Sequence, residues 1–60
     1  MSSTPRPYVV EFRVAGEPFP VKEHVTAYDL QEALYQGSMR LTARNLTAQG
    51  ILDAGPDMEA

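Results

Sequence analysis

The stretch Tyr8-Val-Val-Glu-Phe-Arg-Val-Ala15 alternates in character with a period of two residues. Successive side chains of a β-strand point to opposite faces, and β-branched and aromatic residues favour strands. The alternation therefore predicts a strand whose solvent-exposed face is marked by Glu11 and Arg13. The opposite, apolar face consists of Tyr8, Val10, Phe12 and Val14.

A second, weaker alternation runs from Val21 to Ala27. Its more apolar side includes Glu23, so we expect an exposed edge strand. The segment Gly16-Glu-Pro-Phe-Pro20 separates the two runs, and its prolines have no N–H group to donate to a strand ladder. The two strands are therefore expected to form a hairpin with a long connection that its prolines stiffen.

Leucines at helical spacing follow the second strand. Leu30, Leu34 and Leu41 lie at steps of four and seven residues, as on one face of a helix. Thr26 is expected to cap the first turn, because its hydroxyl can accept a hydrogen bond from a backbone amide three residues later. Asp29 then lies near the positive end of the helix dipole.

The end of this helix depends on Gly37, which costs about 1 kcal/mol relative to alanine inside a helix. The helix either stops near Gln36 or continues through the glycine to Arg44. We favour continuation, because Leu41 keeps the helical phase and basic residues suit a last turn. Asn45 is then expected to end the helix in a left-handed conformation.

A third alternation, from Leu46 to Leu52, completes an α+β fold with β-β-α-β order. We expect a three-stranded antiparallel sheet with one helix packed on one face. A right-handed crossover places the third strand beside the first, which gives the strand order 2-1-3. Residues 1–7 are expected to form a flexible leader, 8–52 a single domain and 53–60 a flexible acidic tail. The bare sheet face or an unpaired edge is where contacts are expected.

Composition excludes several classes of protein. The chain has 60 residues, no cysteine and a net charge of −3, so disulfides and cysteine-based zinc sites are absent and a phosphate-backbone binder is disfavoured. No aliphatic run exceeds two residues, which predicts neither a membrane span nor a secretory signal. We therefore expect a cytoplasmic protein that binds no nucleic acid directly.

Groups suited to catalysis are few. His24 is the only histidine, and the chain has no thiol, no G-x-S-x-G motif and no phosphate-binding glycine loop. The acidic residues lack the spacing typical of metal loops. The sequence predicts no enzyme, no cofactor and no metal site. An enzyme built on His24 is the least favoured alternative.

Aromatic and acidic residues around the helix are the candidates for partner binding. Tyr28 and Tyr35 are seven residues apart, with Glu32 between them, and amphipathic aromatics are enriched at protein interfaces. Asp29 and Glu11 would add negative charge and oppose a basic partner. The alternative is that the tyrosines only border the small core.

Two resemblances suggest functions. The segments Tyr8-Val-Val-Glu-Phe-Arg13 and Val25-Thr-Ala-Tyr-Asp-Leu-Gln-Glu-Ala-Leu34 are similar to the partial β-β-α-β domain of HicB-like antitoxins. That resemblance implies an antitoxin-like or regulatory domain that homodimerises and binds a partner protein. In size, acidity and lack of an active site, the chain also resembles small phage-encoded inhibitors, anti-CRISPR proteins included. This second resemblance implies an inhibitor that covers the basic surface of a host nucleic-acid-handling complex, such as a CRISPR effector, and it is the function we favour.

Overall fold

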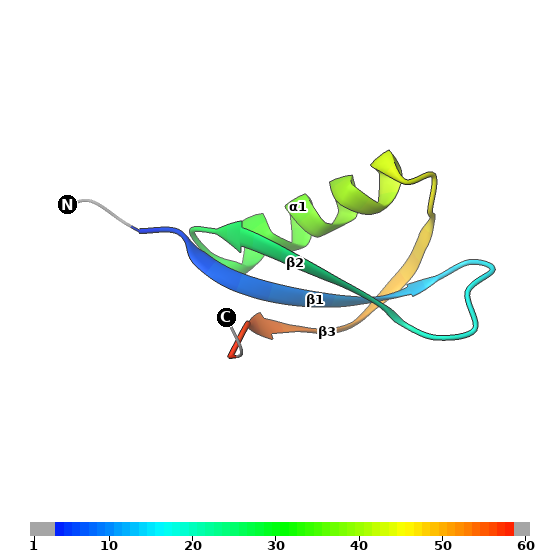
Figure 1. The fold of residues 1–60 in the computed structure, drawn as a ribbon, viewed down its shortest axis with the longest axis horizontal. Helices are drawn as coiled ribbons and strands as arrows, with labels where there is room; N and C mark the ends of the chain where they lie inside the picture. Colours follow the sequence, from blue (N-terminus) through cyan, green and yellow to red (C-terminus); the bar gives the residue numbers. More distant parts are fainter. Residues whose placement is uncertain (1–3, 59–60) are drawn as a thin grey trace.

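The computed structural model describes residues 4–58, which form one sheet and one helix (Figure 1). The elements follow the order β1 (Arg6–Val14), β2 (Val21–Ala27), α1 (Leu30–Ala43) and β3 (Ala48–Pro56). The sheet is antiparallel and has the strand order β2-β1-β3. The expected β-β-α-β arrangement and strand order are therefore confirmed.

The two strand pairings differ in regularity. β1 pairs with β2 without interruption, from Arg6 opposite Ala27 to Phe12 opposite Val21. The pairing of β1 with β3 shifts register twice, so that Leu52 and Gln49 become extra residues on the β3 side. Such bulges bend the strand that carries them and increase its twist.

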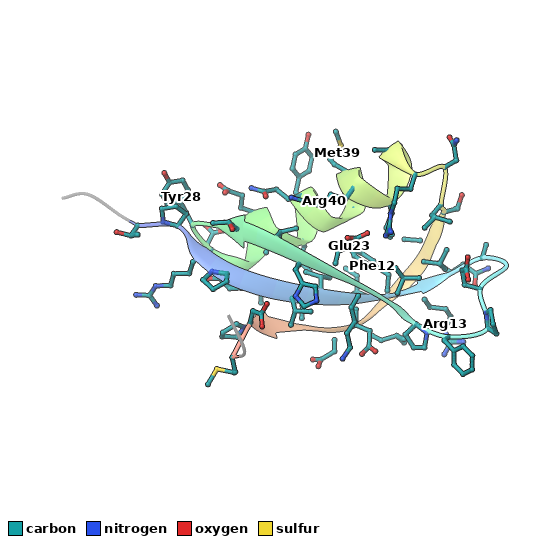
Figure 2. The ribbon with its side chains drawn as sticks, in the orientation of Figure 1. Phe12, Arg13, Glu23, Tyr28, Met39 and Arg40 are labelled. Carbon is teal, nitrogen blue, oxygen red and sulfur yellow. The ribbon has the colours of Figure 1, made fainter. Side chains whose placement is uncertain are left out.

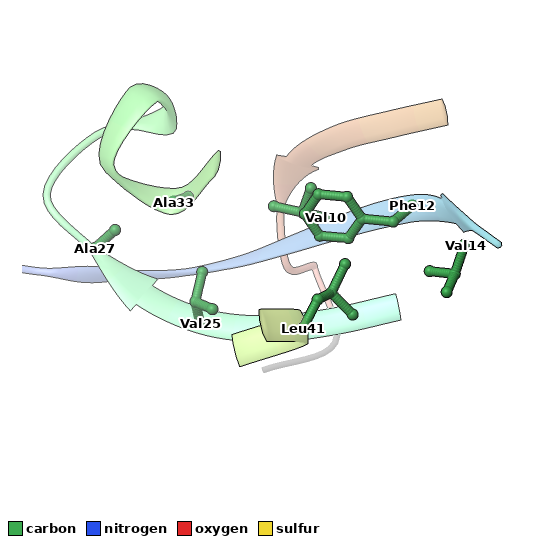
Figure 3. Close-up of a cluster of buried hydrophobic side chains, with 7 residues drawn as sticks. All are labelled: Val10, Phe12, Val14, Val25, Ala27, Ala33 and Leu41. Atoms are coloured by element: carbon green, nitrogen blue, oxygen red, sulfur yellow. The ribbon is translucent and has the colours of Figure 1, made fainter. Parts of the chain in front are cut away.

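The core lies between the sheet and the helix. The helix covers one face of the sheet, and alternate residues of β1 and β2 point toward it. It contributes the side chains of Ala33 and Leu41 to the core. The buried apolar cluster consists of Val10, Phe12, Val14, Val25, Ala27, Ala33 and Leu41 (Figure 3). The alternation of the two strands predicts five of these seven residues, but of the expected leucine stripe only Leu41 is fully buried, because Leu30 is 41% exposed and Leu34 only packs against the cluster.

The helix continues through Gly37 to Ala43, as expected. Gly37 is buried, and a methyl group at this position would lie 3.0 Å from Cε2 of Phe12 and 3.1 Å from Cζ. The glycine thus lets the helix approach β1 closely. Arg44 follows the helix as its C-cap, and Asn45 has the expected left-handed conformation, with φ 61°.

The start of the helix differs from expectation. The N-cap is Asp29, whose side chain accepts a hydrogen bond from the backbone N–H of Glu32 at 2.8 Å. Thr26 belongs instead to β2, where it is opposite Pro7 of β1. Pairing with β1 holds the chain extended as far as Ala27, so the helix begins later than it would with Thr26 as its cap.

The ordered domain also extends beyond the expected boundaries of 8 and 52. β1 begins at Arg6, and β3 continues to Pro56, so four residues expected in the acidic tail belong to the sheet. Ala54 packs against the core, and Pro56 is tolerated because β3 is an edge strand. Residues 1–3 and 59–60 of the expected leader and tail lie outside the described residues.

Candidate protein-binding surface

The five candidate partner-binding residues lie on two different faces of the molecule. Val10 and Phe12 of β1 are buried under the helix, so Glu11 between them points to the opposite face of the sheet. Its cross-strand neighbours are Lys22 of β2 and Asp53 of β3. The sequence suggested that Glu11 and the tyrosines form one surface. The structure instead places Glu11 on a different face of the molecule.

Asp29 and Glu32 both stabilise the start of the helix. Asp29 accepts from the N–H of Glu32, and Oε1 of Glu32 accepts from the N–H of Tyr28 at 3.3 Å. The same Glu32 oxygen accepts from the side-chain amide of Gln36 at 3.0 Å. Since side chains at this end satisfy backbone amides that have no partner within the helix, both carboxylates have a structural role.

The two tyrosines are exposed, but only one lies on the helix. Tyr28 precedes the N-cap and is 56% exposed, so the expected helical spacing between the tyrosines does not apply. Tyr35 lies in the middle of α1 and is 66% exposed. Neither ring belongs to the core cluster or packs against it as Tyr8 does, which disfavours the alternative that they border the core.

Met39 is a candidate that the sequence analysis missed. It lies one helical turn after Tyr35, and its side chain is 54% exposed and points away from the sheet (Figure 2). Tyr35 and Met39 are on the side of α1 opposite Ala33, Gly37 and Leu41. We call this pair the outer ridge of α1. The spacing of four residues from Tyr35 was the signal in the sequence that could have identified Met39.

An ion pair joins β2 to the residue that ends α1. Glu23 of β2 is buried, and it forms an ion pair and hydrogen bond with Arg44. Arg40 is exposed and lines the same shallow hollow as Glu23 and Arg44. β2 is the edge strand that was expected, but its more apolar side is not exposed: Glu23 is buried there under the helix and forms an ion pair with Arg44.

His24, the residue that an enzyme would need, lies on the face of the sheet away from the helix. Its Nδ1 is 2.9 Å from Oδ2 of Asp57. Ser38 lies on α1, so the sheet separates its hydroxyl from the imidazole. Within residues 4–58, no group of three or more histidine, aspartate or glutamate side chains is placed to hold a metal ion.

Comparisons of the chain with family models, curated proteins and solved structures gave no match. In the part of the chain that the structure describes, no helix combines the length and the apolar character needed to cross a membrane. The exposed side chains are therefore the basis on which a function can be proposed.

Proposed function

We propose that this chain is a non-enzymatic protein-binding module that inhibits a host nucleic-acid-handling complex, such as a CRISPR effector. In this proposal the chain is encoded by a phage or another mobile element and acts in the cytoplasm. The outer ridge of α1 docks on the complex, and the bound module covers a basic surface that would otherwise hold nucleic acid. The chain itself contacts no nucleic acid.

The exposure of Tyr35 and Met39 is the observation that carries this proposal. A solvent-facing helix ridge normally bears charged side chains, whereas this one bears an aromatic ring and a thioether one turn apart. Tyrosine and methionine are enriched at the centres of protein interfaces. An amphipathic helix that presents residues four positions apart suits a partner with an apolar groove.

The charge of the chain supports the choice of partner. Eight acidic residues against five basic ones give a net charge of −3, which favours approach to a basic surface. Asp29 and Glu32 lie at the start of α1, at one end of the outer ridge. Although both carboxylates stabilise the helix, their charge still contributes to the field around the ridge.

The test is a DNA-binding assay with a purified CRISPR effector loaded with its guide RNA. The wild-type chain is expected to prevent target binding, and Tyr35→Ala and Met39→Ala are expected to raise the concentration needed by about tenfold each. Thr26→Ala is the control, because Thr26 is exposed on β2 and its neighbours Val25 and Ala27 are buried under the helix, so its side chain lies on the face of the sheet away from the outer ridge. Inhibition that is unchanged in both ridge variants, or absent in the wild type, would contradict the proposal.

An antitoxin-like or regulatory domain that homodimerises and binds a partner protein is the second candidate. A second exposed apolar surface, at the end of the β1–β2 hairpin, favours it because Phe19 there is 77% exposed. This function requires both self-association and binding of a toxin-like protein. A chain that dimerises but inhibits no effector would favour this candidate over the first.

A further inference from the structure

The two edges of the sheet are poorly suited to pairing with another chain. β3 carries two bulges and ends in Pro56, and bulges and prolines on an edge strand prevent a continuous ladder. β2 carries Glu23, a charged residue that points to the covered side of the sheet and is neutralised by Arg44. Inward-pointing charges on edge strands serve the same protective purpose. Self-association through a strand edge is therefore disfavoured.

The end of the hairpin offers a different surface. A hollow of about 150 Å³ lies there, lined by Arg13, Val14, Glu17, Pro18, Phe19, Pro20 and Leu52. Phe19 is 77% exposed and Leu52 is 44% exposed, so the two largest apolar side chains of the hollow face solvent. We call Arg13, Glu17, Phe19 and Leu52 the hairpin-end surface.

The loop that carries Phe19 is held at its base. The N–H of Glu17 donates to the carbonyl of Val14 at 3.1 Å, and the N–H of Ala15 donates to the carbonyl of Thr47 at 3.0 Å. Gly16 supplies the positive φ of 84° that the turn requires, and a proline on each side of Phe19 restricts the backbone further. A ring presented on so restricted a loop loses little conformational entropy on binding.

The charges beside the apolar centre are self-complementary. Arg13 and Glu17 line the same hollow and have opposite signs, and neither forms an ion pair with any residue in the described range 4–58. A two-fold axis brings each residue of a surface opposite its counterparts in the second copy. One such arrangement places Arg13 of each copy next to Glu17 of the other.

We propose that the hairpin-end surface binds a second copy of this chain. Phe19 and Leu52 of the two copies form the apolar centre, and the reciprocal Arg13–Glu17 pairs border it. The surface consists of four residues, far fewer than the roughly 20–30 per partner of a standard interface, so the dimer is weak and forms at high concentration. The outer ridge of α1 takes no part in it, and the dimer does not depend on the proposed inhibition.

Sedimentation velocity of the full chain tests the dimer, over concentrations from about 10 µM to about 1 mM. The wild type is expected to shift from monomer to dimer within this range. Phe19→Ser and Arg13→Glu are each expected to raise the dissociation constant by about tenfold or more. Circular dichroism shows whether the variants remain folded, which is expected because both side chains are exposed.

A charge exchange distinguishes this arrangement from other dimers. The double variant Arg13→Glu, Glu17→Arg restores the reciprocal pairs and is expected to recover most of the self-association that Arg13→Glu loses. Tyr35→Ser is the control that leaves self-association unchanged. A wild type that stays monomeric at every concentration would overturn the proposal. A dimer that tolerates Phe19→Ser, or a double variant as weak as Arg13→Glu, would also overturn it.

Discussion

Gly37 of α1 lies directly against the ring of Phe12 in β1, and a methyl group on the glycine would approach two ring carbons to within 3.0 and 3.1 Å. The same methyl group would be 3.6 Å from Cβ of Val10. Phe12 is 1% exposed, so its ring is enclosed in the core. The absence of a side chain at Gly37 thus allows the helix to lie close to the sheet at this point.

Gly37→Ala is expected to destabilise the fold despite the better helix propensity of alanine. Propensity alone would add about 1 kcal/mol to the free energy of unfolding. Overpacking a filled core typically costs about 1–3 kcal/mol, so we expect a net loss of about 1 kcal/mol. Thermal or urea unfolding measures it, with the exposed Ser38→Ala as the control. A Gly37→Ala variant more stable than wild type would show that the helix can move away at little cost.

Asp29→Ala is expected to lower the free energy of unfolding by about 1 kcal/mol, because it removes the side chain that accepts from the N–H of Glu32. Thr26→Ala tests the cap that the sequence indicated. Since Thr26 is an exposed residue of β2, its substitution is expected to cost only a few tenths of a kcal/mol. Equal losses in the two variants, measured by urea unfolding, would contradict the assignment of Asp29 as the cap.

Arg44→Met is expected to destabilise the protein, because it leaves the carboxylate of Glu23 buried without its ion-pair partner. The side chain of Arg44 is 53% exposed and water screens the pair, so we expect about 1 kcal/mol rather than the larger cost of a fully buried pair. Arg40→Met is the control.

The double variant Arg44→Met, Glu23→Gln separates the pair from other effects of losing Arg44. A neutral glutamine has no buried charge to compensate, so the cost of Arg44→Met is expected to be smaller in the Glu23→Gln background. The double-mutant cycle gives this coupling energy directly. A cost that is the same in both backgrounds would show that the ion pair contributes nothing.

Glu11→Gln is expected to leave inhibition of the effector unchanged, whereas Tyr35→Ala weakens it. Glu11 lies on the face of the sheet that α1 does not cover, so it is remote from the outer ridge. The same DNA-binding assay compares the two variants. If Glu11→Gln weakened inhibition as strongly as Tyr35→Ala, the partner would have to contact both faces, and the outer ridge alone would not define the binding surface.

The candidate site was only partly predictable from the sequence. Tyr35 was identified because amphipathic aromatic residues are enriched at protein interfaces, and the structure places it on α1 with 66% of its surface exposed. The spacing between Tyr28 and Tyr35 was misleading, because the chain at Tyr28 has not yet entered the helix. Glu11 was grouped with the helix residues on charge alone, although the alternation from Tyr8 to Ala15 already placed it on the face opposite the apolar residues that the helix covers.

The sequence by itself determined the type of each element. The alternation from Tyr8 to Val14 predicts a strand with one apolar face, and the leucine spacing after Ala27 predicts a helix, because both periods are local properties of the backbone. The right-handed crossover rule also predicted that β3 would lie beside β1, but the tertiary structure alone decided which individual residues of distant segments meet. Glu23 is paired with a residue 21 positions later, Asp53 to Pro56 joined the sheet beside β1, and Gly37 came to lie on Phe12. Such contacts depend on how the packed layers fit together, and no local pattern contains that information.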